Sequence, residues 1–156
     1  MITFGNPGIA PKLAVMLAVV LSASAGTAIV GTSPAFAASP TIAVDQSSGL
    51  VDAQATVVVG SGFTAGDRVG VVQCNRPADP AQISCNDADG AVVTVGARGE
   101  FQTQLTVRRE FNGTNPLTGK PAGHVDCGVA RGCAVTAGSI AYPGIFANPV
   151  PISFGG

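Results

Sequence analysis

Four cysteines are the residues of this sequence whose type and spacing most directly imply chemistry, and that chemistry is oxidation to disulfides. They fall into two near pairs, Cys74 with Cys85 and Cys127 with Cys133. Four cysteines allow three pairings. We favour the two local bridges because each closes a short loop that contains turn residues, prolines in the first and glycines in the second. Each bridge would contribute about 2–3 kcal/mol, mainly by restricting the unfolded chain.

Catalytic and metal-binding chemistry has few candidate side chains. His124 is the only histidine of the sequence, and there is no C-x-x-C pair of the kind that binds zinc. The sequence also has no G-x-S-x-G motif to present a serine nucleophile. We therefore expect no enzyme and no metal site, and we interpret His124 as a solvent-facing or hydrogen-bonded residue on a strand.

The first 37 residues have the composition of an export signal. Lys12 precedes an apolar run from Leu13 to Leu21, and Ala35-Phe36-Ala37 has the form of a processing site. The apolar run is shorter than the about 20 residues that a membrane-spanning helix needs. We therefore expect cleavage after Ala37 or Ala38, secretion into an oxidising environment and no membrane association of the mature chain.

Residues 38–156 are then the folded part, and their length is that of one domain. The sequence has no tryptophan and a net charge of −1, which becomes more negative once the leader takes Lys12 away. Strong binding to nucleic acid needs clustered Lys or Arg, and Arg108-Arg109 is the only basic pair of the chain. At most a weak contact of the protein itself with DNA is expected, and a monomer is the expected state.

The elements that must position these residues are short strands. No segment after the leader keeps a helical period over ten residues, whereas apolar or alternating runs recur between turn signals such as Asp89-Gly90 and Thr118-Gly119. The predicted strands are Thr41 to Val44, Ala55 to Val59, Arg68 to Gln73, Ala91 to Val95, Phe101 to Val107, Gly123 to Cys127, Cys133 to Thr136 and Pro149 to Phe154.

Alternation along one of these strands indicates which side chains are buried. Phe101, Leu105 and Val107 occupy one face of their strand, and polar residues occupy the other, so these three side chains should lie in the core. Asn112-Gly113-Thr114 has the form of a glycosylation acceptor, but we interpret Asn112-Gly113 as a tight turn. The strand count predicts an all-β, immunoglobulin-like antiparallel sandwich, with a barrel as the alternative.

Several short segments, in shared order and spacing, carry a resemblance to the neocarzinostatin family of enediyne apoproteins. Any one of them is a weak signal, but their combination is specific. They are Ser47-Ser48-Gly49-Leu50 with Asp52, Gly62-Phe63-Thr64-Ala65-Gly66, Gln73-Cys74, Cys85-Asn86, Leu105 through Gly113, Val125-Asp126-Cys127 and Ile152-Ser153-Phe154-Gly155.

This resemblance implies a fold, a ligand and a function. The family has a seven-stranded sandwich with a small two-stranded arm, and the cleft between them holds a noncovalent enediyne chromophore. The protein shelters and delivers the chromophore, and the chromophore, not the protein, cleaves DNA, which makes the complex an antibiotic. The resemblance also implies the two local disulfides.

The resemblance places a set of residues at the cleft, drawn from the strand before the first bridge, the loops and the strand after the second bridge. We interpret Tyr142 as a residue at the rim of the cleft that stacks on the ligand. We interpret Phe111 and Leu105 as core residues. The predicted chromophore-binding residues are Gly70, Val72, Gln73, Arg76, Ile83, Leu117, Thr136, Gly138, Ser139, Tyr142 and Phe146.

The sequence departs from neocarzinostatin itself where that protein has aromatic side chains. This chain has Arg76, Gly90 and Pro116 or Leu117 there, so its pocket should suit a different chromophore. The rival hypothesis is a secreted β-sandwich interaction module, such as an inhibitor or adhesin, with no chromophore. It would show an exposed apolar patch, whereas a carrier would show a cleft.

Overall fold

The fold was analysed in a computed structural model, which describes residues 39–129 and 131–156. The predicted leader, residues 1–37, and its alternative cleavage site at Ala38 lie outside the described residues. The strands are β1 (Thr41–Val44), β2 (Gln54–Ser61), β3 (Arg68–Asn75), β4 (Ala91–Thr94), β5 (Phe101–Val107), β6 (Glu110–Asn115), β7 (Lys120–Asp126), β8 (Cys133–Ser139) and β9 (Val150–Ile152). Two short 3-10 helices, η1 (Pro80–Gln82) and η2 (Asp87–Asp89), separate β3 from β4.

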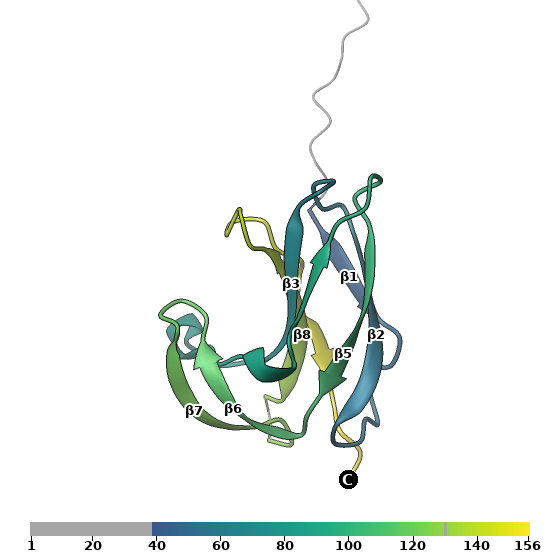
Figure 1. Ribbon diagram of the computed structural model, residues 1–156. Coiled ribbons are helices and arrows are strands. Elements are labelled where there is room, and N and C mark those ends of the chain that lie inside the picture. The colour runs from purple at the N-terminus through teal and green to yellow at the C-terminus, as the bar shows by residue number, and fades with distance from the viewer. Residues whose placement is uncertain (1–38, 130) are drawn as a thin grey trace, which may run out of the picture. The chain divides into compact units, whose positions relative to one another are not determined.

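Seven of these strands form the two sheets of an antiparallel sandwich. One sheet has the order β1-β2-β5 and the other the order β4-β3-β8-β9, and Figure 1 shows β2 and β5 facing β3 and β8. Alternate side chains of both sheets meet between them and form the core, for example Val58, Leu105, Val71 and Val135, all of which are buried. The all-β sandwich prediction is confirmed.

The remaining two strands, β6 and β7, pair with each other and with no other strand, and they form the arm. Phe111 pairs with Val125 and Asn112 with His124, so the prediction of a tight turn at Asn112-Gly113 is wrong. The chain reverses instead around Gly119, which has a φ of +67° that favours glycine. Gly113 is needed for close packing, because a Cβ there would overlap the Ser84 side chain.

The sequence located the other strands to within a few residues. Phe101, Leu105 and Val107 are buried as predicted, and so is Phe111. β8 continues to Ser139, three residues beyond the predicted end, because it stays paired with β3 as far as Val69. Only Val150–Ile152 of the predicted last strand pairs as a ladder, with β8, and Phe154 forms an isolated bridge to Leu50.

Both local disulfides are present, Cys74–Cys85 and Cys127–Cys133. The first fastens the loop that carries η1 and η2 to the end of β3. Within that loop, Cys85 also pairs with Thr114 of the arm through two backbone hydrogen bonds of 2.8 and 2.9 Å. The first disulfide loop therefore connects the four-stranded sheet to the arm.

Candidate functional site

The outer face of the four-stranded sheet carries two paired glycines, Gly70 and Gly138. Val92, Gly70 and Gly138 are Cα partners across β4, β3 and β8, so they form one row on the same side of the sheet. Val72 and Thr136 form the next row along β3 and β8. We call the surface formed by these five residues the glycine face. A Cβ on Gly70 would meet its nearest neighbours only at 4.0 Å, whereas a Cβ on Gly138 would lie 3.4 Å from the Cβ of Phe146.

Apolar side chains border the glycine face at one end. Phe146 forms an antiparallel bridge with Gly138 and extends the row of Val92 and the glycines. The Cα atoms of Val92 and Phe146 are then about 14 Å apart, three strand spacings. A Cβ on Gly70 would lie 4.0 Å from Cγ1 of Ile140. Four apolar or aromatic side chains at this border are each at least half exposed: Val92, Ile140, Tyr142 and Phe146. Side chains of these types are more often buried in a core.

The arm and the first disulfide loop border the opposite end. Cys74 follows Val72 on the same side of β3, and its disulfide partner Cys85 pairs with Thr114 of the arm. The side chain of Asn115 donates to the carbonyl of Ala81 at 2.8 Å, which adds a second attachment. In Figure 1 the arm and the yellow 140–148 loop both extend from the side of β3 and β8 that is turned away from β2 and β5.

The structure brings six of the predicted residues to this region. Gly70, Val72, Thr136 and Gly138 form the floor, and the backbone pairing of Phe146 with Gly138 places Phe146 beside it. Tyr142 lies in the same loop, where its amide donates to Ser139 Oγ at 2.8 Å. Ile83 is half-buried in the first disulfide loop, and Leu117 is 73 % exposed in the turn of the arm.

Gln73 and Ser139, two more of the predicted residues, do not lie on the glycine face. Both point to the inner side of the sheet, because each is adjacent along its strand to a residue of the glycine face. Gln73 is 1 % exposed and its amide binds the backbone of Arg108 at 2.7 and 2.8 Å. Ser139 is also buried. Neither side chain belongs to the glycine face.

Arg76 also lies apart from the glycine face. Its Nη1 donates to the carbonyl of Arg131 at 3.4 Å. It lines a hollow of about 270 Å³ beside His124 of the arm, and a second one of about 410 Å³ beside Ser47 and Ser48. No residue of the glycine face lines either of these two hollows.

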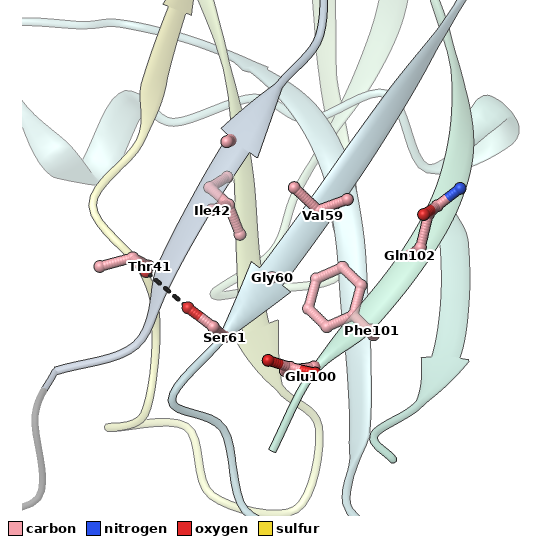
Figure 2. Close-up of a pocket in the computed structure, with 9 residues that line it drawn as sticks. Thr41, Ile42, Val59, Gly60, Ser61, Glu100, Phe101 and Gln102 are labelled. Atoms are coloured by element: carbon pink, nitrogen blue, oxygen red, sulfur yellow. Dashed lines mark hydrogen bonds between the residues drawn. The ribbon is translucent and has the colours of Figure 1, made fainter. Parts of the chain in front are cut away.

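A larger hollow of about 520 Å³ lies on the other sheet, at the Thr41 end of β1 and the adjoining ends of β2 and β5 (Figure 2). Thr41 and Ser61 bind each other across its edge, with their hydroxyl oxygens 3.0 Å apart. Phe101 belongs to its lining but is only 7 % exposed, so it offers little surface. None of the residues that line this hollow is among the predicted chromophore-binding residues.

Charged groups near the arm are paired with one another. The Arg108 guanidinium lies 2.5 Å from a carboxylate oxygen of Asp89, and this hydrogen bond holds the pKa of Asp89 below its usual value. His124 faces Glu110 at 3.6 Å in an exposed position. Within residues 39–129 and 131–156, no three His, Cys, Asp or Glu side chains gather as metal ligands would. No helix in these ranges is long and apolar enough to cross a membrane.

Sequence reasoning missed two residues of the region, Val92 and Ile140. Val92 follows Gly90-Ala91 in a short apolar run, and nothing local distinguishes its side of the strand from that of Val93. The register with Gly70 decides it, and register is set by tertiary pairing. Ile140 lies beyond the predicted strand Cys133 to Thr136, and its amide donates to the carbonyl of Arg68 at 2.9 Å, so tertiary pairing with β3 places it beside Gly70.

Comparisons with known proteins agree with this architecture. The neocarzinostatin family model matches residues 42–154. Apokedarcidin from Actinomycete sp. (strain L585-6) is 34 % identical over 119 residues, which cover 76 % of this chain and all of that protein. The solved structure of macromomycin is similar with a TM-score of 0.65 and 29 % identity, over 73 % of this chain and 99 % of its own. For the solution structure of apokedarcidin the TM-score is 0.58 and the identity 32 %, over 76 % and 100 % of the two chains. This chain therefore belongs to the neocarzinostatin family.

Proposed function

We propose that this chain is a secreted apoprotein that holds a noncovalent enediyne chromophore on the glycine face, and that the released chromophore cleaves DNA. Membership of the neocarzinostatin family supports the carrier role. Export is supported by the leader-like composition of residues 1–37 and by the two disulfides, which persist in oxidising environments. The protein itself performs no covalent step in this proposal.

One observation carries the proposal: Gly70 and Gly138 are paired between exposed apolar side chains, Val92 on one side and Phe146 on the other. Without a Cβ atom, Gly70 allows a flat ligand to approach the backbone closely, since nothing lies closer than 4.0 Å to where that Cβ would be. Val72 and Ile140 supply apolar contact, and the hydroxyl of Thr136 supplies a polar one. Such a surface combines apolar contact with a single polar group that can orient a ligand.

The direct test is mass measurement of protein secreted by its native producer. Under native conditions the mass should exceed that of residues 38–156 by the mass of a small molecule, and denaturation should release that molecule. The complex should also absorb light at wavelengths well above the protein band. Identical native and denatured masses, with no released molecule, would overturn the carrier proposal.

The rival function is a secreted module that binds another protein, and the exposed apolar side chains Leu117, Tyr142 and Phe146 are the observation in its favour. Exposed apolar surface of this kind also marks protein-binding sites. The same preparation separates the two hypotheses. A carrier elutes as a monomer with a small-molecule absorbance, whereas an interaction module elutes with a second polypeptide and without that absorbance.

A further inference from the structure

The two covalent connections between the arm and the sandwich lie side by side, at the end of the arm opposite to its contacts with the first disulfide loop. Only Arg108 and Arg109 separate the end of β5 from the start of β6. The chain leaves the arm after Asp126, and the next amide, that of Cys127, donates to the carbonyl of Arg109 at 2.8 Å. The incoming and outgoing segments therefore lie side by side, and we call Arg108, Arg109 and Cys127 the arm root.

Gln73 binds the arm root through both the nitrogen and the oxygen of its side-chain amide. Its Nε2 donates to the carbonyl of Arg108 at 2.7 Å, and its Oε1 accepts from the Arg108 N–H at 2.8 Å. Nε2 also lies 3.1 Å from Sγ of Cys127. Because Gln73 is 1 % exposed, water cannot readily replace these bonds. One buried amide thus contacts both chain segments that enter and leave the arm.

The Arg108 side chain is fixed from the other side, by η2. Its Nε and Nη2 lie 2.5 and 3.3 Å from the two carboxylate oxygens of Asp89. Asp89 in turn accepts from the side chain of Asn86 at 2.9 Å, and Asn86 is buried. A two-point pair between guanidinium and carboxylate fixes orientation as well as distance. The backbone and the side chain of Arg108 are therefore both restrained.

We infer that Gln73 is a positioning residue that sets the angle of the arm against the glycine face and thereby limits how fast a ligand leaves. The part of this inference that concerns the ligand rests on the proposed function. Gln73 acts from the inner side of β3, while its neighbour Val72 faces the ligand surface. This role differs from the direct chromophore contact that the resemblance implies for Gln73, which stays a prediction.

The variant Gln73→Glu tests the inference because its carboxyl group can be switched by pH. When protonated, the carboxyl donates to the Arg108 carbonyl and accepts from the Arg108 N–H, as the amide does. When ionised, it cannot donate. Burial should raise the pKa of the new carboxyl. The protonated form should prevail at about pH 5, and an NMR titration of the carboxyl in the variant establishes that the ionised form is present at pH 7 before exchange rates are compared.

The readout is amide hydrogen exchange measured by NMR. At each pH, the exchange rate of an amide in the variant is divided by the rate of the same amide in wild type. At pH 7, β6 and β7 should exchange at least tenfold faster in Gln73→Glu, while β2 and β5 keep wild-type rates. At about pH 5 the ratio for the arm should return close to one. The charged groups at the arm root include Arg108 and Arg109 themselves, Asp89 beside Arg108 and Asp126 beside Cys127. The Asp52 carboxylate also accepts from the Arg109 N–H. The wild-type reference contains all of these groups, which removes their contribution from the ratio.

The matched control is Gln104→Glu, the same exchange of side chains at an exposed position of β5. It should leave the arm unchanged at both pH values. If Gln73→Glu does not fold at pH 7, it can be purified at pH 5, and Asp89→Asn provides a second, milder release of the arm root. Equal acceleration of arm and sandwich, or an arm ratio that does not depend on pH, would overturn the positioning role.

Ligand release is measured separately with 8-anilinonaphthalene-1-sulfonate, a fluorescent probe for apolar surface. Its dissociation from Gln73→Glu should be at least fivefold faster than from wild type at pH 7 and equal at pH 5. An arm that exchanges faster while the probe leaves at the wild-type rate would overturn the link to ligand retention. Failure of the wild type to bind the probe, with arm exchange still responding to pH, would count against the proposed function and leave the positioning role intact.

Discussion

Ser84 of the first disulfide loop packs so closely against Gly113 of the arm that a Cβ on Gly113 would overlap the Ser84 Oγ. The same Cβ would lie 3.2 Å from the Cys85 carbonyl oxygen and from the ring edge of Phe111. Ser84 is 2 % exposed, and among the described residues its Oγ has no hydrogen-bond partner. The arm is therefore held against the loop by shape as well as by the pairing of Cys85 with Thr114.

The first prediction follows from this contact. Gly113→Ala should lower the free energy of unfolding by about 1–3 kcal/mol, because the added methyl group overpacks a buried site. Ser84→Ala alone should be nearly neutral, since it removes a hydroxyl that makes no hydrogen bond. The double variant should recover part of the loss, as measured by urea denaturation. Gly144→Ala, at a position with nothing within 4 Å, is the control. Additive costs in the double variant would contradict the contact.

The second prediction concerns the floor of the glycine face. Gly70→Val should fold normally, because a Cβ at Gly70 meets its nearest neighbours only at 4.0 Å. Its stability should equal or exceed that of wild type by up to about 1 kcal/mol, since glycine weakens a strand interior. The affinity for 8-anilinonaphthalene-1-sulfonate should nevertheless fall at least tenfold, because the side chain of the valine fills the space above the backbone.

The control for Gly70→Val is Ala55→Val, which enlarges an exposed side chain on β2 of the other sheet. Fluorescence titration of this variant should give the wild-type affinity. Unchanged probe affinity in Gly70→Val, with thermal melting showing an intact fold, would mean that the ligand binds elsewhere. The hollow at Thr41, Ser61 and Phe101 would then be the next surface to test.

The third prediction concerns Tyr142, which is 57 % exposed at the border of the glycine face. Tyr142→Ala should speed release of the bound chromophore about fivefold to tenfold, the effect of losing roughly 1 kcal/mol of stacking. Stability should change by less than about 0.5 kcal/mol, as for other exposed positions. Val51→Ala, at a 65 % exposed position, is the control. A release rate equal to that of wild type would assign Tyr142 to loop packing alone.

The fourth prediction concerns pH. The Arg108 hydrogen bond lowers the pKa of Asp89 from its ordinary value of 3.8. A carboxyl with a lower pKa in the folded state stabilises the fold above its unfolded pKa, and this contribution is lost as the pH falls through the folded value. The wild type should therefore lose stability below about pH 4. Asp89→Asn has no carboxylate to pair with Arg108 at neutral pH, so its free energy of unfolding should fall less over the same range.

The measurement for Asp89→Asn is the midpoint of urea denaturation at intervals between pH 7 and pH 2. Asp87→Asn is the matched control, because Asp87 lies in the same 3-10 helix, is exposed and is more than 4 Å from any basic nitrogen in the part of the chain that the structure describes. Its acid profile should follow that of wild type. Parallel profiles for wild type and Asp89→Asn would show that the ion pair with Arg108 adds nothing to the stability of the fold.

The sequence by itself determined the features that depend on local pattern. Alternation placed Phe101, Leu105 and Val107 in the core, because a strand side chain reaches the interior only at every second residue. The spacing of the cysteines favoured two local bridges, since each closes a short loop that a turn can span. The order of the short segments was enough to recognise the family.

Tertiary structure decided the features that depend on distant partners. Asn112-Gly113 has the composition of a turn, yet it lies in β6, because pairing with β7 and packing on Ser84 outweigh local preference. Gln73 and Val72 are neighbours in the sequence, but successive side chains of a strand point to opposite faces of the sheet. The pairing of β3 with β8 therefore places the Gln73 amide in the interior at the arm root and the Val72 side chain on the glycine face. The row of Val92, Gly70, Gly138 and Phe146 likewise exists only in the register of four separate segments, which no local sequence pattern specifies.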